Sequence, residues 1–201
     1  MEKPDKKTIE KIKAYLEKNL SKKRFAHSMN VAAAAKKLAC KYGEDRDIAY
    51  FAGMAHDIAK ELCREKQYEL AKGCPFDVSE IELSSAPLLH APAGAQLLSK
   101  KFGITDIEIL KAVRYHTVAC GSMSRLSQIV YIADLISADR EYKDVKKMRK
   151  FAAQGIEKAM LEALRFSVCD SVQKGNTIPL STIAAYNEFA VRLKENKKEQ
   201  N

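Results

Sequence analysis

The residues of this sequence that could do chemistry are four histidines and two aspartates. One aspartate directly follows a histidine, and the other comes after the last histidine along the chain. The six residues are His27, His56, Asp57, His90, His116 and Asp134. Each residue alone is more often a satisfied core group, or part of a chance dipeptide, than a functional group. Their combination is what carries information.

The helical pattern turns these side chains towards the core. Three of them, His27, His116 and Asp134, each continue the apolar face of a helix. His56 and Asp57 sit near the end of a helix that is apolar nearly all round, and both can reach one pocket off its edge. Buried without partners, these groups would cost several kcal/mol each, and a bound cation removes that cost. Imidazole with carboxylate suits iron, manganese or zinc better than calcium, and no cysteine is positioned to join them.

Helical periodicity dominates the elements that must position these groups. No stretch shows the alternating β-branched pattern of a strand, so we expect one all-α domain. The first helix is expected to start at an N-cap on Thr8 and to carry its apolar residues up to Leu20. The other helices are expected at about 22–42, 47–60, 64–72, 78–83, 91–102, 106–115, 124–136, 145–172 and 181–194.

Composition fits an ordinary globular chain. Of the 201 residues, 46% are hydrophobic and 30% charged, with only 8 Gly and 5 Pro, which excludes collagen-like and low-complexity classes. No apolar run is long enough to span a membrane, and the polar N-terminus does not resemble a secretory signal. The five cysteines contain no C-x-x-C pair, which predicts reduced thiols and a cytoplasmic location. A net charge of +9 favours anionic partners.

Several short strings give the chain a resemblance to a known family. The order H…HD…H…H…D resembles the HD-domain metallophosphohydrolases, an all-α superfamily. The strings RFAHS (24–28), HDIAK (56–60), LLHAPAGA (88–95), RYHT (114–117), MSxL (123–126) and YIADLIxxxR (131–140) narrow the match. They resemble one branch, the HD-domain symmetrical bis(5'-nucleosyl)-tetraphosphatases, or YqeK family, over about residues 20–190.

The resemblance implies a fold, a reaction and a set of roles. We expect a single HD-domain bundle of about nine to eleven helices that hydrolyses diadenosine tetraphosphate to two ADP, by attack of a metal-bound water on a phosphoanhydride. The ion is expected to be iron, one or two per chain, with manganese or another divalent transition metal as the alternative. The implied metal ligands are His27, His56, Asp57 and Asp134, with His90 and His116 for a second ion. The implied catalytic residues are Asp57, Lys60, His90 and His116. The implied substrate-binding residues are Arg24, Ile58, Ala59, Lys60, His90, His116, Thr117, Arg140, Thr177, Ile178, Pro179 and Thr182.

Two departures from the family pattern stand beside the expected site. Ala119 replaces a glycine shortly after the HT pair, and Ser137, Ala138 and Asp139 replace a Glu-Pro-Gly-like turn. Neither removes an expected ligand, so they bear on the shape of the substrate loops.

For the domain organisation, we expect residues 1–20 as an N-terminal helix packed on the domain, 21–195 as the metallophosphohydrolase domain and 196–201 as a disordered tail.

Other functions remain open from the sequence. Another HD-domain nucleotide phosphohydrolase, such as a nucleotidase or a phosphodiesterase, could use the same cluster. The positive charge could instead serve nucleic-acid binding with purely structural histidines, although no binding motif or interleaved aromatic pattern supports it. A scaffold that keeps the metal but has lost turnover is a third reading. We expect a nucleotide substrate with ADP as product, no nucleic acid or membrane partner, and a possible homodimer through an exposed apolar helix face.

Overall fold

The computed structural model describes residues 3–198, and the regular secondary structure in this part of the chain is entirely helical. It holds 11 α-helices and one short 3-10 helix, with no strand, which confirms the predicted all-α class. The elements are α1 (Lys6–Asn19), α2 (Lys22–Tyr42), α3 (Arg46–Ala55), α4 (Arg64–Lys72), α5 (Glu80–Ser84), η1 (Ala86–Leu88), α6 (His90–Phe102), α7 (Ile107–Arg114), α8 (Arg125–Ile136), α9 (Val145–Gln154), α10 (Ile156–Gln173) and α11 (Leu180–Lys198).

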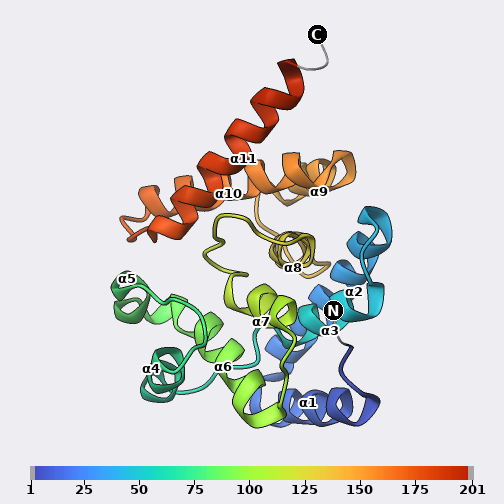
Figure 1. The fold of residues 1–201 in the computed structure, drawn as a ribbon, viewed down its shortest axis with the longest axis vertical. Coiled ribbons are helices and arrows are strands. Elements are labelled where there is room, and N and C mark those ends of the chain that lie inside the picture. Colours follow the sequence, from blue (N-terminus) through green and yellow to red (C-terminus); the bar gives the residue numbers. More distant parts are fainter. Residues whose placement is uncertain (1–2, 199–201) are drawn as a thin grey trace.

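The helices are arranged in three tiers in Figure 1. Helices α9, α10 and α11 form the upper tier, from which the end of α11 projects, and α1, α4 and α6 form the lower one. Helices α2, α3, α7 and α8 lie between them, and the hydrophobic core runs through this middle tier. None of the described helices combines the length and the apolar character that crossing a membrane requires.

Capping residues set most of the helix ends. At the start of α2 the Ser21 side chain accepts a hydrogen bond from the Arg24 amide, and the helix ends at Gly43 in the left-handed conformation, with φ 75°. Asp106 and Ser124 cap α7 and α8 through their side chains in the same way as Ser21. The ends predicted for α2 and α4 are confirmed, and most others differ by one or two residues.

Two predicted helix ends near the N-terminus are wrong. Helix α1 is capped by Asp5 and not by Thr8: the Asp5 carboxylate accepts from the Thr8 amide at 2.8 Å, and its charge suits a helix N-terminus. Helix α3 ends at Ala55 instead of continuing to residue 60. There the His56 ring nitrogen Nδ1 bonds the Gly53 carbonyl, and the following amides bond carbonyls three residues back, so the chain turns away from the helix.

Two further differences lie in the C-terminal half. The long helix expected over residues 145–172 is two helices, because Gly155 is extended and has poor helix propensity. Helix α11 continues to Lys198, past the expected end at residue 194, and the rest of the expected tail lies outside the described residues. The expected domain boundary at residue 20 stays a prediction.

Helices α2 and α3 approach each other at backbone distance around Gly53. A Cβ atom on this glycine would lie 3.0 Å from the Ala32 Cα, 3.0 Å from the Ala35 Cβ and 3.1 Å from the Val31 carbonyl oxygen. These distances are shorter than most contacts of real Cβ atoms, so a larger residue here would push the neighbouring atoms of α2 away, and glycine allows the close approach. The close approach brings His27 on α2 towards the residues that follow α3.

A buried ion pair fixes the segment that leads into α6. The Arg114 guanidinium, at the end of α7, lies 2.7 Å from a carboxylate oxygen of Glu82 on α5, and both residues are buried. Arg114 also donates to the Asp77 carbonyl at 2.6 Å. The pair therefore joins the segment that precedes His90 to the helix that precedes His116.

We predict that breaking this pair on one side destabilises the fold. The Glu82→Leu variant leaves the Arg114 guanidinium buried without a counter-charge, so it should lose about 3 kcal/mol or more of unfolding free energy. Urea unfolding followed by circular dichroism measures the loss. The double variant Glu82→Leu/Arg114→Met is the control, because it removes both charges and should recover most of the stability. A single variant as stable as the parent would contradict the prediction.

Candidate metal centre

The six candidate side chains come from five different parts of the fold and meet in its interior. His27 lies on α2, His56 and Asp57 directly follow α3, and His90 opens α6, while His116 follows α7 and Asp134 lies near the end of α8. The four histidines and Asp57 are each 5% exposed or less, and the Asp134 side chain is 17% exposed. The expected convergence of these groups on the core is confirmed.

The first group of ligand atoms gathers around His27 and His56. The His27 Nε2 atom lies 2.9 Å from the Asp134 Oδ1 atom, and His56 Nε2 lies 3.9 Å from the same oxygen. Asp57 joins them, with its Oδ2 atom 3.4 Å from His56 Nε2. Atoms of His27, His56 and Asp57 all lie within 4.8 Å of one another, close enough to share one metal ion.

The second group shares the Asp57 carboxylate. Its other oxygen, Oδ1, lies 3.2 Å from His90 Nε2 and 3.6 Å from His116 Nε2, and these two nitrogens are 3.1 Å apart. Asp57, His90 and His116 also meet the spacing for one ion. Asp57 thus presents one oxygen to each group, which is the arrangement of a carboxylate that can bridge two ions.

Backbone carbonyls and a carboxylate orient three of the imidazole rings. The Nδ1 atoms of His56 and His116 each lie 2.7 Å from a carbonyl oxygen, that of Gly53 and that of Val113. A carbonyl can only accept, so in each ring Nδ1 carries a hydrogen, and in the neutral ring Nε2 offers a lone pair to the cluster. His27 Nδ1 lies 2.7 Å from an oxygen of Asp139, which leaves its Nε2 free in the same way.

The Nε2 atoms without hydrogen-bond partners indicate whether this cluster fits a metal ion. The Nε2 atoms of His27 and His56 are buried and have no hydrogen-bond partner among the described residues. His27 Nε2 approaches the Asp134 oxygen at 2.9 Å without making a hydrogen bond. Two donors about 2.1 Å from one ion and at right angles to each other are about 3 Å apart. The donor atoms therefore fit a divalent transition metal.

The charges of the cluster match this function. Burial pushes the pKa of Asp57 upward, but the surrounding imidazoles outweigh burial and hold it well below its usual range. Burial acts on the Asp134 pKa in the same direction, and His27, His56 and Arg140 together lower it. Burial and the nearby Lys60 lower the pKa of His90 to about 4, against the opposing effect of Asp57. At neutral pH the two carboxylates are ionised and His90 is neutral, which are the states that bind metals.

Three cations surround the carboxylates. The Arg24 guanidinium lies 2.9 Å from Asp57 Oδ2, on the side of the first group. Arg140 pairs with the Asp134 carboxylate and donates from Nε to its backbone carbonyl at 2.8 Å. Lys60 places its Nζ atom 3.2 Å from both ring nitrogens of His90, and burial lowers its pKa.

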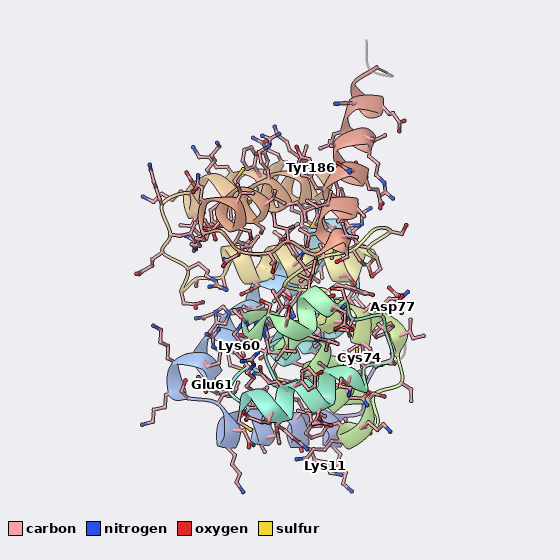
Figure 2. All side chains as sticks on the ribbon, turned by 90° about the vertical axis from the view of Figure 1, so that its left-hand side faces the viewer. Lys11, Lys60, Glu61, Cys74, Asp77 and Tyr186 are labelled. Carbon is pink, nitrogen blue, oxygen red and sulfur yellow. The ribbon has the colours of Figure 1, made fainter. Side chains whose placement is uncertain are left out.

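Lys60 reaches this position from a turn and not from a helix face. The helix expected over residues 47–60 would place Lys60 one helical turn after Asp57, and this is wrong because α3 ends at Ala55. The buried Gln67 side chain holds the turn instead, by donating to the carbonyls of Ala59 and Lys60 at 2.9 and 3.0 Å. Figure 2 shows Lys60 next to Glu61 in this turn, below helix α11, which carries Tyr186.

The remaining expected substrate-binding residues lie in different environments. The Thr117 hydroxyl is buried without a hydrogen-bond partner in the described part of the chain, directly after His116. Thr182 donates to the Val118 carbonyl at 2.6 Å, which ties the start of α11 to the same loop. Thr177 is exposed, Ile178 is half-buried and Pro179 is buried. The side chains of Ile58 and Ala59 are buried in the core.

Sequence reasoning did not identify two residues that support the centre. Asp139 was seen only as part of an unusual turn, although its carboxylate lies on His27 Nδ1. Gln67 was not singled out at all. Asp139 lies outside any helix, where periodicity gives no direction, and Gln67 acts through backbone carbonyls that leave no trace in the sequence.

Comparisons with known proteins agree with this geometry. The family model described as "HD domain" matches residues 24–139. Proteins named "Bis(5'-nucleosyl)-tetraphosphatase, symmetrical" are similar to this chain. The one from Halalkalibacterium halodurans is 31% identical over 88% of this chain and 94% of its own length. The one from Staphylococcus aureus is 32% identical over 90% and 94%.

A solved structure is also similar along nearly the whole chain. It is a crystal structure from Clostridium acetobutylicum, described as a predicted HD superfamily hydrolase involved in NAD metabolism. It is 37% identical, with a TM-score of 0.86 over 91% of this chain and 97% of that chain.

We predict that Asp139 supports metal binding through His27. The Asp139→Ala variant removes the acceptor that holds the His27 ring, so metal affinity should fall by about 10- to 100-fold. Competition with a chromogenic chelator at neutral pH measures the affinity. Asp144→Ala is the matched control, because the Asp144 side chain makes no cap hydrogen bond, and it should bind metal as the parent does. Equal affinities in the two variants would refute this role of Asp139.

Proposed function

The chain belongs to the HD domain family, in the group of the symmetrical bis(5'-nucleosyl)-tetraphosphatases, and from this membership we propose that it hydrolyses diadenosine tetraphosphate to two ADP. One observation carries the proposal. A single buried carboxylate, that of Asp57, serves two groups of metal-ligating atoms and is flanked by cations that can neutralise phosphates. The relatives are similar over most of their length, so the proposal covers the whole reaction and not one part of it.

The residues that would hold the metal follow from the two groups. His27, His56, Asp57 and Asp134 would hold the first ion, and His90 and His116 would join Asp57 around a second. When bound, a divalent transition metal acidifies a water and neutralises charge on the phosphates. We propose iron as this metal, with manganese or another divalent transition metal as the alternative. Imidazole and carboxylate ligands suit all of these ions.

The three cations take the negative charge of the tetraphosphate. Arg24 and Arg140 now pair with Asp57 and Asp134, and their guanidinium groups can grip phosphate oxygens in bidentate fashion. Lys60 acts as a point charge beside the neutral His90 ring, so both stand where phosphate oxygens would approach the second group. We place Thr117, Thr182 and the segment 177–179 along one nucleotide half, because Thr182 bonds the loop that follows His116.

Symmetrical cleavage follows if one ADP half is held with its terminal phosphorus at the cluster. The oxygen of water then bonds to that phosphorus, and the phosphorus bond to the central bridging oxygen breaks. This oxygen leaves with the other half, so one tetraphosphate and one water give two ADP. A location in the cytoplasm and a homodimer stay predictions.

The first test of the proposal is the identity of the products. The metal-loaded protein should convert diadenosine tetraphosphate to ADP alone, as seen by ion-exchange chromatography during the first turnovers. A product mixture of ATP and AMP would contradict symmetrical cleavage. A panel of mononucleotides and cyclic nucleotides is the control, since faster turnover of these would favour a nucleotidase or a phosphodiesterase instead.

The second test removes the shared carboxylate. The Asp57→Ala variant should lose both bound metal and turnover, because each group of ligand atoms loses a member. Elemental analysis of the purified protein and the ADP assay measure the two effects. Circular dichroism must show an intact helical fold, because the variant also leaves Arg24 without its partner. Full metal content with full activity would exclude Asp57 from the centre.

A further inference from the structure

A large cavity outside the metal cluster lies between α2, the end of α8 and α9. Its volume is about 730 Å³, which falls in the range of small-molecule sites. Apolar side chains such as Leu38 and Ile136 form much of its wall, and Lys37, Lys41 and Arg149 add positive charge. No acidic residue is among the described residues that line it.

No residue of the cluster is among the described ones that line the cavity, but the lining is connected to the His27 end of the cluster at three points. Asn30, which lines it, lies one helical turn after His27 on α2. Ala138, on the opposite wall, precedes Asp139, whose carboxylate lies on His27 Nδ1 at 2.7 Å. On a third side Arg149 donates to the Arg140 carbonyl at 3.3 Å. Three separate walls thus hold residues that are close in sequence, or hydrogen-bonded, to residues at this end of the cluster.

The four imidazoles form a row that gives the cluster two ends. Ring centroids lie 5.3 Å apart from His27 to His56, 4.9 Å from His56 to His116, and 5.1 Å from His116 to His90. The loop tied to α11 by Thr182 follows His116, on the far side of His56 from His27. A tetraphosphate along the row therefore directs its two nucleosides to opposite ends, one towards α11 and the other towards the cavity.

We propose that this cavity receives the nucleoside of the second, departing half of the dinucleoside tetraphosphate. The inference rests on the proposed function and adds the place where the leaving ADP is held. Because a helix rises about 1.5 Å per residue, Asn30, Ala34 and Lys37 lie roughly 4.5, 10 and 15 Å beyond His27 along α2. A leaving group of two phosphates, a ribose and a base can extend along this distance.

The chemistry of the lining fits the parts of that leaving group. Lys37, at the far end, is exposed and has no acidic partner among the described residues, so its ammonium can donate to a ring nitrogen of the base. The apolar wall suits the faces of a base. The Asn30 side chain, nearest to the cluster, is half-buried and makes no hydrogen bond within the described part of the chain, so its amide can donate to an oxygen of the diphosphate.

The first experiment reads occupancy of the cavity in the unmodified chain. Cys40 is exposed and lines the cavity, while Cys169 is exposed on α10 outside it. A non-hydrolysable analogue, with a methylene group in place of the central bridging oxygen, should slow alkylation of Cys40 at least about tenfold at saturation. Alkylation of Cys169, followed in the same samples by mass spectrometry, should not change. Equal alkylation of Cys40 with and without the bound analogue would overturn the proposal.

The second experiment changes the cavity itself. Ala34→Phe fills it and Lys37→Glu reverses a charge at its wall, so each should raise KM for diadenosine tetraphosphate, by about tenfold or more for Ala34→Phe, with kcat little changed. Lys36→Glu is the matched control, since Lys36 is the exposed neighbour that does not line the cavity, and its KM should stay within about twofold of the parent.

The outcomes separate this inference from the proposed function. If the parent chain produces ADP while Ala34→Phe and Lys37→Glu keep its KM, the cavity is not the second nucleoside site and the proposed function stands. If the parent chain produces no ADP, both fail together. Should Ala34→Phe not fold, Lys37→Glu and the alkylation of Cys40 decide the question.

Discussion

The Asp57 carboxylate is the group on which the rest of this structure depends. It is almost fully buried, yet it stays ionised because imidazoles and the Arg24 guanidinium surround it. Each of its oxygens serves a different set of histidines. A buried charge of this kind destabilises a fold unless its partners are held in place. Much of the helix packing around the cluster serves to hold the partners of Asp57 in place.

Two kinds of support hold these partners, and they act at opposite ends of the cluster. On the side of His27, helices α2 and α3 touch at Gly53, and Asp139 fixes the ring. On the side of His90 and His116, a buried ion pair joins the two segments that precede these residues. The cations then lie on the outside of the carboxylates, where a polyphosphate would meet them. The cluster therefore has two different ends, and a bound substrate would lie along the line from one end to the other.

The sequence predicted the parts of this centre that depend on helical repeat, and little of what depends on turns. The C-terminal ends of α2 and α4 follow from the glycines that stop each helix, and the inward direction of His27 follows from the apolar face it continues. The end of α3 could not be predicted in this way, because it depends on a side-chain hydrogen bond. The His56 ring bonds the Gly53 carbonyl, which the helix backbone would otherwise use. Likewise, spacing places Arg24 one turn from His27, but its contact with Asp57 arises only from tertiary packing.

The contact at Gly53 has a consequence for how freely such chains can diverge. At Gly53 the nearest atoms of α2 are backbone atoms and the Ala35 Cβ, so the approach of the two helices at this point is limited by main-chain dimensions. Substitutions elsewhere in the core can accumulate and be repacked without altering that separation. A variant of this chain that keeps Gly53 can therefore retain the spacing between His27 and His56 while other core residues change.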